Sequence, residues 1–313
     1  MQRVSRGSKT EGFQHEAVLY EGLDDLASTT VPFIREGLER QEPVLVAVLP
    51  DRIRTLRSAL GSDADRVEFL DIAEFGGNPG RILPMWRGFV DRSLGSGSVR
   101  GIGEPVWSSR RDVEIEECHL HESLLNIAFD DGPPWRLMCP YDVDSLPAEI
   151  VADAMRTHPV VSAAGGPDIE YGGHHHAQAR FASPLTPAPE SAHQISFAHG
   201  DLSRLRGFVG TWALEAGLSE ERAGYMVLAA HEIATNSIVH GGGSGELHVW
   251  SQPEAFVVEL RDRGQISDPL VGRDPALDLD EGGRGVWLVH QLCDLVQVRS
   301  LPTGTVVRLF AWL

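Results

Sequence analysis

Cysteine is scarce in this sequence. The 313 residues include three cysteines, Cys118, Cys139 and Cys293, and no two of them have C-x-x-C spacing. An odd number of widely separated thiols argues against the disulfide frameworks that small secreted proteins use in place of a large core. Reduced thiols are what a cytoplasmic protein is expected to carry.

Long apolar segments are also missing. No uncharged apolar run reaches the roughly 20 residues that a membrane-spanning helix needs. Residues 1–12 are polar and lack the apolar centre of a signal peptide. We therefore expect a cytoplasmic protein without a membrane segment.

Positive charge is in short supply. Lys and Arg number 27 against 45 Asp and Glu, which gives a net charge of −18 and an isoelectric point near 5.1. Such a chain is poorly suited to following a phosphate backbone, so direct nucleic-acid binding is not expected, whereas partners with basic surfaces are. The length and a hydrophobic content of 42% fit two soluble domains of ordinary size.

The first half alternates strand-like and helix-like segments. Strands are expected over residues 15–20, 43–49, 67–70, 98–103 and 135–139, and helices over residues 23–40, 51–60, 79–94, 112–129 and 146–155. This alternation predicts an α/β layer around a mostly parallel sheet. No P-loop and no G-x-G-x-x-G motif follows any of these strands, so nucleotide binding is not predicted in this half.

Several motifs of residues 13–162 carry a family resemblance. Among them are Phe33-Ile34-Arg35-Glu36-Gly37-Leu38, Gly103-Glu104-Pro105-Val106-Trp107, Cys139-Pro140-Tyr141-Asp142 and Thr157-His158-Pro159. The segment resembles the MEDS sensory domain, which takes its name from regulators of methanogens and methylotrophs. The resemblance implies an input module for a small organic molecule.

Four polar residues are candidates for the cleft of such a sensor, namely Glu104, Glu122, Asn126 and Cys139. The pair Glu122 and Asn126 has E-x-x-x-N spacing, which also occurs further along the chain. No D-x-G and no glycine-rich turn follows this first pair at a suitable distance. We therefore interpret Glu122 and Asn126 as hydrogen-bonding residues inside the domain.

A metal site is the competing interpretation of this region. Its ligands would be Cys118, His119, His121 and Cys139. Residues 118, 119 and 121 fan around one helix and cannot all converge without unwinding it. A buried Cys139 beside partly exposed helix residues is the simpler interpretation.

Composition changes abruptly over residues 163–192. Glycine and proline cluster at residues 163–167, 172–173 and 184–189. We expect a mobile connector there. Its run His174-His175-His176 offers metal-competent imidazoles, although adjacent histidines on a flexible chain are ordinarily solvated.

The second half, residues 193–313, has a different pattern. A strand over residues 194–197 precedes an amphipathic helix over residues 201–216, with Gly217 as its C-terminal cap and Ser219 as the N-cap of the next helix. Strands at residues 246–251, 255–261, 295–299 and 305–312 and a short helix at residues 285–292 follow. Two or three helices against one face of a largely antiparallel sheet are expected.

The helix that Ser219 caps carries a second E-x-x-x-N pair. Side chains four residues apart share a helix face, so Glu232 and Asn236 point into the same space. Small and apolar residues are expected on the opposite, packing side, namely Val227, Ala230, Ala234 and Ile238.

Two glycine-containing motifs follow this pair. Asp262-Arg263-Gly264 lies at the end of a strand, where a carboxylate can accept a hydrogen bond from an exocyclic amine and glycine lets a flat base approach the backbone. Gly282-Gly283-Arg284-Gly285 opens a helix, whose free N–H groups suit phosphate oxygens.

In order and spacing, these three motifs resemble the N, G1 and G2 boxes of the gyrase, heat-shock-90, histidine-kinase and MutL superfamily of ATP-binding domains. Within it, Gly283-Arg284-Gly285-Val286-Trp287-Leu288-Val289 and Gly304-Thr305-Val306-Val307-Arg308-Leu309 look most like anti-sigma-factor serine kinases. The resemblance covers about residues 193–313. It implies a Bergerat-type α/β sandwich with ATP and Mg²⁺ as cofactors.

The resemblance also implies a role for each matching residue. Asn236 would ligate Mg²⁺ through its side-chain oxygen, and Glu232 would be the general base for an incoming serine hydroxyl. Asp262 would recognise the adenine amino group. The remaining contacts with the nucleotide would come from Gly264, Gly283, Arg284, Gly285 and Thr305.

The implied protein is a cytoplasmic anti-sigma regulator. It would bind a sigma factor, phosphorylate a STAS-type anti-anti-sigma protein on Ser or Thr, and respond to its sensory domain. Related kinases are often dimers, so a homodimer is compatible with this interpretation.

Two alternatives stay open, because the G1 motif departs from its family. Gln265 and Ile266 follow Gly264 where a second glycine is usual, which puts the flexibility of the lid in doubt and keeps open an ATP-binding module that binds a sigma factor without catalysis. A two-component histidine kinase is less favoured, since a proline- and glycine-rich connector replaces its phosphoacceptor helix. The lid, residues 265–282, is acidic, and the available counter-charges are Arg273 within it and Arg284 just after it. Both arginines are expected to be solvated at the surface.

Overall fold

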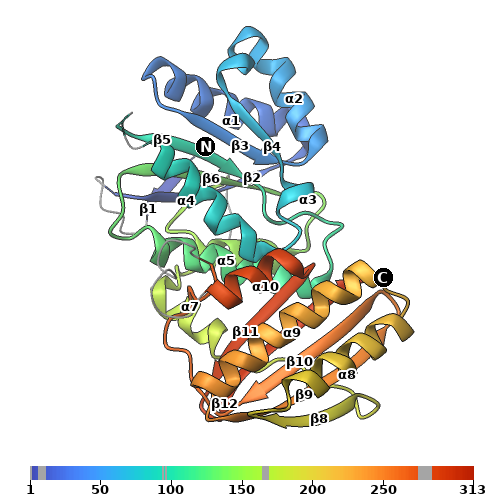
Figure 1. Cartoon of the computed structure of the whole chain (residues 1–313). Helices are drawn as coiled ribbons and strands as arrows, with labels where there is room; N and C mark the ends of the chain where they lie inside the picture. Colours follow the sequence, from blue (N-terminus) through green and yellow to red (C-terminus); the bar gives the residue numbers. More distant parts are fainter. Residues whose placement is uncertain (1, 6–11, 94, 96, 164–168, 274–283) are drawn as a thin grey trace. The chain divides into compact units, whose positions relative to one another are not determined.

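The chain forms two compact units. The computed structural model describes residues 2–5, 12–93, 95, 97–163, 169–273 and 284–313 (Figure 1). Its units are Met1–Ala177 and Gln178–Leu313. The division falls within helix α7 (Gly173–Phe181), which occupies part of the stretch where the sequence predicted a mobile connector.

A seven-stranded sheet forms the centre of the first unit. Its order is β1-β7-β2-β6-β5-β3-β4, and every neighbouring pair is parallel except β1 with β7. The predicted α/β layer is therefore confirmed, with β1 and β7 as additional strands. The strands are β1 (Gln2–Ser5), β2 (Gln14–Tyr20), β3 (Val44–Val48), β4 (Glu68–Asp71), β5 (Val99–Gly103), β6 (Trp135–Asp142) and β7 (Val160–Ala163).

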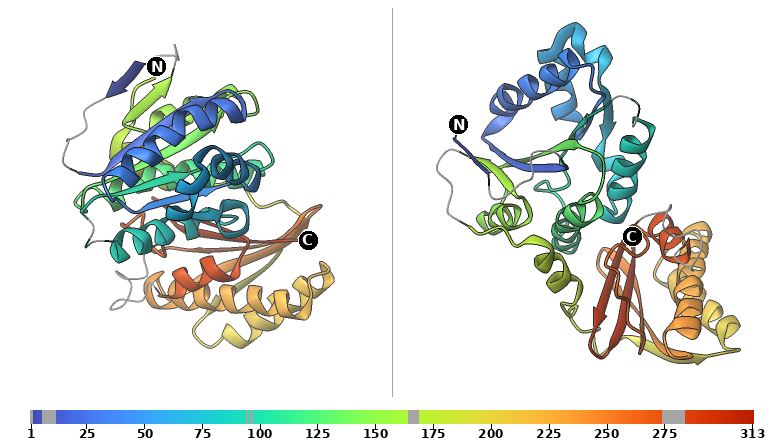
Figure 2. Two further views of the ribbon diagram at one scale, coloured as in Figure 1. Left: turned by 90° about the horizontal axis from the view of Figure 1, so that it is seen from above. Right: turned by 90° about the vertical axis from the view of Figure 1, so that its left-hand side faces the viewer.

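Helices cover both faces of this sheet (Figure 2). Apolar residues of α1 and α2 pack on one face, against Val18, Val46 and Ile102 among others. On the other face Trp86 of α4 packs so closely on Gly101 that a Cβ there would lie 2.7 Å from the indole. The helices are α1 (Gly22–Glu39), α2 (Pro50–Leu60), α3 (Ile72–Phe75), α4 (Ile82–Arg92), α5 (Asp112–Ala128) and α6 (Ala148–Thr157).

The second unit is a five-stranded antiparallel sheet of order β11-β12-β10-β9-β8. Its helices lie on one face, as Figures 1 and 2 show, which confirms the predicted sandwich. The elements are β8 (His193–Ala198), α8 (Leu202–Glu215), α9 (Glu220–His240), β9 (Ser244–Gln252), β10 (Ala255–Asp262), α10 (Arg284–Leu292), β11 (Leu295–Leu301) and β12 (Gly304–Trp312).

Local signals fix the start of α9. The side chain of Ser219 accepts a hydrogen bond from the backbone N–H of Arg222 at 3.3 Å, as predicted for an N-cap. Gly217 follows α8 with a φ of +94°, a conformation that other residues rarely adopt. These two residues set the register of α9 and hence the directions of its side chains.

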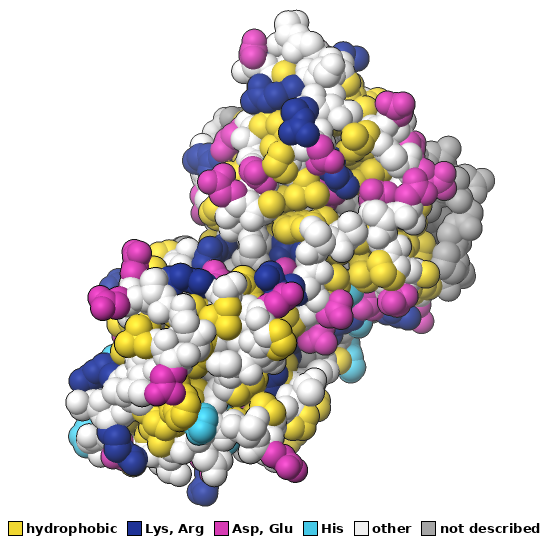
Figure 3. Space-filling model, turned by 90° about the vertical axis from the view of Figure 1, so that its right-hand side faces the viewer, with side chains coloured by type: hydrophobic (Ala, Val, Ile, Leu, Met, Phe, Trp, Pro, Cys, Tyr) yellow, Lys and Arg dark blue, Asp and Glu magenta, His cyan; other side chains and the backbone are white. Residues whose placement is uncertain are grey.

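Charged side chains are dispersed on the face drawn in Figure 3, where Lys and Arg are interspersed with Asp and Glu. The described chain contains no helix with both the length and the hydropathy needed to cross a membrane.

Candidate nucleotide site and sensory site

Helix α9 carries the polar pair Glu232 and Asn236 on one face and packs against its neighbours with a different face. Glu232 and Asn236 are both half-buried. The packing face is rotated from the predicted one: Val227 and Ile238 are only partly buried. The buried positions of α9 are instead Ala223, Met226, Ala229, Ala230, Ile233, Ala234 and Ser237.

The first turn of α10 lies against this pair. A Cβ built on Gly285 would be 3.1 Å from Glu232 Oε2 and 3.4 Å from Asn236 Nδ2. Glycine at position 285 therefore leaves open the space that the carboxylate and the carboxamide share. Arg284 is exposed, as predicted, and Gly283 lies outside the described residues.

Asp262, at the end of β10, is held by two donors. The Ser237 hydroxyl donates to Oδ2 at 2.6 Å, and the Gly264 N–H donates to Oδ1 at 2.8 Å. Each carboxylate oxygen keeps a further lone pair, so the group can still accept from a ligand amine. Asp262 is thus a pre-positioned acceptor.

Glycines surround this carboxylate because the backbone comes so close. Gly304 has a φ of +136°, and a Cβ there would overlap the backbone carbonyl of Asp262. A Cβ on Gly264 would lie 2.7 Å from Gly241 Cα. The Thr305 hydroxyl donates to the Gly264 carbonyl at 2.9 Å, which helps to fix the backbone two residues after Asp262.

A cavity of about 530 Å³ opens at the edge formed by the end of β8, the start of β9 and the end of β10. Asp262 lines it together with the arginines at positions 204, 261 and 263. Neither Glu232, Asn236 nor Gly285 lines this cavity. We regard the α9–α10 face as the candidate site, because an acid, an amide and a glycine meet there.

The segment after Gly264 is held in part by a hydrogen bond and by packing. The Ile266 N–H donates to the Ser300 hydroxyl of β11 at 2.9 Å. Arg273 is 3% exposed, so the prediction of a solvated arginine there was wrong. Gly272, with a φ of +70°, approaches Val286 of α10 too closely for a Cβ, which shows how this stretch packs.

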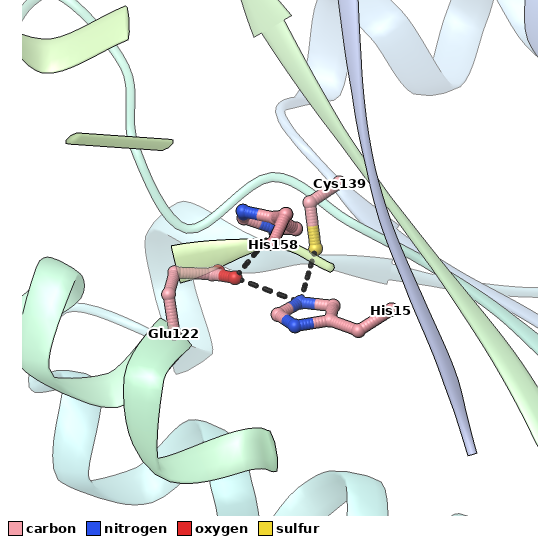
Figure 4. Close-up of side chains that lie close together, drawn as sticks. All are labelled: His15, Glu122, Cys139 and His158. Carbon is pink, nitrogen blue, oxygen red and sulfur yellow. Dashed lines mark hydrogen bonds and ion pairs between the residues drawn. The ribbon is translucent and has the colours of Figure 1, made fainter. Parts of the chain in front are cut away.

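The four sensor candidates separate into two groups. Glu122, Asn126 and Cys139 lie together with His15 and His158, which the sequence analysis did not single out as site residues (Figure 4). His158 belongs to the Thr157-His158-Pro159 motif that carries the family resemblance, and that was the available signal for it. The fourth candidate, Glu104, lies elsewhere.

The alternative metal site of the sequence analysis does not form. Cys118 donates to the Pro105 carbonyl at 3.1 Å, and His119 pairs with Asp153 at 3.0 Å. Both side chains, and that of His121, are buried rather than partly exposed as expected.

Burial and close neighbours shift the pKa values of the side chains around Glu122. It lowers the pKa of His15 to about 4 and raises the pKa of the Cys139 thiol well above its usual range. Burial also opposes ionisation of Glu122, but His158 and His15 outweigh it and hold the pKa of that carboxyl well below its usual range.

Glu104 lies at the carboxyl ends of the parallel strands. Its carboxylate accepts from Arg52 Nε at 3.0 Å and from the Leu49 N–H at 3.1 Å, and the Tyr20 hydroxyl lies 3.4 Å away. Burial raises the pKa of Glu104 to about 7 in spite of Arg52. In open α/β sheets this edge is where ligands usually bind.

Two family models match the chain. Residues 14–159 match the methanogen/methylotroph DcmR sensory domain, or MEDS, and residues 195–311 match the histidine kinase-like ATPase domain. The search of curated proteins found no match. The chain is therefore a sensory domain fused to a kinase-like ATPase domain, and the second domain implies ATP binding.

Proposed function

We propose that this sensory domain fused to a kinase-like ATPase domain is a cytoplasmic anti-sigma regulatory protein. It would bind ATP with Mg²⁺, sequester a sigma factor and phosphorylate a STAS-type anti-anti-sigma protein on Ser or Thr. A small organic molecule at the first domain would modulate it. The observation that carries the proposal is the half-buried pair on α9, Glu232 with Asn236, beside Gly285.

The residues present fit an adenine nucleotide with its metal. Asp262 is fixed as an acceptor for the adenine amine by Ser237 and Gly264. Asn236 offers a hard oxygen of the kind that Mg²⁺ prefers. Gly285 leaves room beside that oxygen for a phosphate, and Arg284 is exposed and free to reach one. Bound ATP would supply the phosphoryl group.

Glu232 is the group we assign to proton removal. Among the described residues its carboxylate has no hydrogen-bond donor and no ion-pair partner, so both oxygens are available. Its Oε2 faces the space beside Gly285. A serine hydroxyl entering that space would donate to this oxygen. It would pass its proton to Glu232 as its own oxygen bonds to the γ-phosphorus of ATP and the bond from that phosphorus to the bridging oxygen breaks, with ADP as the leaving group.

The test is phosphotransfer by the full-length chain. Labelled ATP, Mg²⁺ and a STAS-type antagonist captured from the native cell would be incubated with wild type and with Glu232→Gln. We expect the variant to keep its ATP affinity and to lose transfer by about 10²-fold or more, the usual contribution of a positioned base. Glu221→Gln, an exposed glutamate on the same helix, is the matched control.

Phosphotransfer by Glu232→Gln at the wild-type rate would show that Glu232 is not the general base. Label on histidine, recognised by its acid lability, would instead indicate a two-component kinase. Either result contradicts the proposal as stated.

A second candidate is an ATP-dependent sigma-binding module without catalysis. It is favoured by the segment after Gly264, where Ile266 replaces a flexible position and is tied to Ser300. Under this alternative, Mg²⁺-ATP would tighten sigma-factor binding although no antagonist becomes labelled. A homodimer is compatible with both candidates.

A further inference from the structure

Four buried side chains of the first unit point their ligand atoms at one another (Figure 4). Glu122 Oε2 lies 2.9 Å from His15 Nε2 and 3.0 Å from His158 Nε2, and Cys139 Sγ lies 3.4 Å from His15 Nε2. All the ligand atoms of this four-ligand cluster lie within 4.8 Å of one another. His15 belongs to β2, Glu122 to α5 and Cys139 to β6, and His158 is the C-cap residue of α6, just before β7.

Hydrogen bonds to the outer side of the His15 imidazole fix which ring nitrogen faces the centre of the cluster. Asn126 Nδ2 donates to the Thr157 carbonyl at 2.8 Å, which turns Asn126 Oδ1 toward His15 Nδ1 at 3.1 Å. Because this oxygen only accepts, His15 Nδ1 carries the hydrogen. In the neutral ring, the Nε2 lone pair of His15 therefore points at the centre of the cluster.

An outer hydrogen bond fixes the orientation of the His158 imidazole in the same way. His158 Nδ1 lies 2.7 Å from the Ala154 carbonyl, which also only accepts. His158 Nε2 therefore presents its lone pair to Glu122 as well. Both rings have the orientation that outer hydrogen bonds impose on metal-ligating histidines.

Three acceptors and a sulfur thus converge in a space closed to solvent, with exposed fractions of at most 1% for all four residues. Because the lone pairs of two neutral rings face a buried carboxylate, the centre needs a positive charge, which is either a proton shared between the carboxylate and the rings or a metal ion. A divalent cation with one carboxylate, one thiolate and two neutral imidazoles makes a centre of zero net charge. Binding would release the Cys139 thiol proton to solvent.

We propose that the four-ligand cluster binds one divalent transition-metal ion, with zinc as the best match. Imidazole, thiolate and carboxylate are the ligands that zinc prefers, and four protein ligands without an open position are typical of a structural site. Tetrahedral zinc would separate neighbouring ligand atoms by about 3.3–3.6 Å. The separations of 2.9, 3.0 and 3.4 Å would widen by a few tenths of an ångström, and the longest separations, which do not exceed 4.8 Å, would contract.

The ion would join the central strands to helix α5 and to the chain after α6. Its role is therefore structural, because it would hold together the sheet whose strands carry Glu104 at their carboxyl ends. The cluster shares only Cys139 with the ligand set considered from the sequence, and it is independent of the proposed kinase activity.

The test is the metal content of the native full-length protein. His174, His175 and His176 would first be replaced by Ala, because these histidines of α7 could bind metal adventitiously. Protein from zinc-supplemented cells should then carry about one ion per chain. Protein from cobalt-supplemented cells should show the thiolate-to-cobalt charge-transfer band of a sulfur-ligated, tetrahedral ion.

Cys139→Ser should lose the charge-transfer band and at least tenfold in metal affinity. The matched control is Cys118→Ser, another buried cysteine of the same unit, which should retain both. Equal metal content in the two variants would overturn the proposal. If Cys139→Ser does not fold, X-ray absorption of the wild-type zinc protein decides, since a shell without sulfur, or no bound metal at all, would leave only a hydrogen-bonded cluster.

Discussion

The two E-x-x-x-N pairs of this chain have the same spacing and opposite surroundings. On α5, Glu122 is fully buried between two histidines, and Asn126 is committed to His15 and to Thr157. On α9, Glu232 and Asn236 are half-buried, and the nearest feature is a glycine that leaves space open. Spacing places two side chains on one helix face, but the neighbouring elements decide whether that face is sealed or available to a ligand.

The largest expected effect is a difference in the stability that Glu122 and Glu232 each contribute to their own unit. Glu122→Gln removes the buried carboxylate that balances the positive charge held at the centre of this group, whether a proton or a metal ion, so the free energy of unfolding of the first unit should fall by about 3–5 kcal/mol. Glu232→Gln removes no internal partner among the described residues and should change the stability of the second unit by less than about 0.5 kcal/mol. Denaturant unfolding of the full chain, followed by fluorescence and circular dichroism, would measure both. Equal losses would show that the two pairs are equally structural.

A third carboxylate, Glu104, should make the stability of the first unit depend on pH. Its pKa rises from 4.5 to about 7 on folding, so the folded state binds more protons between these values. Its contribution to stability is therefore complete below pH 4.5 and is lost as the pH rises through 7, by about 3 kcal/mol. Melting temperatures between pH 5 and pH 8 should fall more steeply for wild type than for Glu104→Gln. Parallel curves would contradict the assignment.

The smallest of these effects concerns the open space beside α9. Gly285→Ala places a methyl group 3.1 Å from Glu232 Oε2 and should weaken ATP binding about tenfold, or about 1.4 kcal/mol. Gly224→Ala is the control, because a Cβ there meets nothing within 4 Å and should leave binding unchanged. Calorimetric titration of both variants with Mg²⁺-ATP measures the difference. Similar affinities would mean that the nucleotide does not use this space.

Much of the second domain was predictable because its signals are local. Ser219 caps α9, Gly217 ends α8, and four-residue spacing put Glu232 and Asn236 side by side. The details that failed depend on packing between elements. The α9 face rotated to bury Met226 and Ile233, because the position of a helix on its sheet is set by the whole interface.

The group around Glu122 could not have been predicted from spacing. His15 and His158 are 143 positions apart, and they meet because β2 and β7 are adjacent parallel strands, with Glu16 paired to Val160. Cys139 joins them because β6 lies on the other side of β2, with Cys139 paired to Ala17. Strand order is a global property, so no local pattern in the sequence shows this meeting.

The central claim is that the pair on α9 and the carboxylate on β10 hold a single Mg²⁺-ATP. Calorimetric titration of the full-length chain with ATP, with and without Mg²⁺, tests it most directly, using wild type, Asn236→Ala and Asp262→Asn. We expect Mg²⁺-dependent binding in wild type, loss of the Mg²⁺ dependence in Asn236→Ala, and affinity at least tenfold weaker in Asp262→Asn, since a recognising acceptor is replaced. Absence of ATP binding in wild type, or the same Mg²⁺-dependent affinity in all three proteins, would contradict the account.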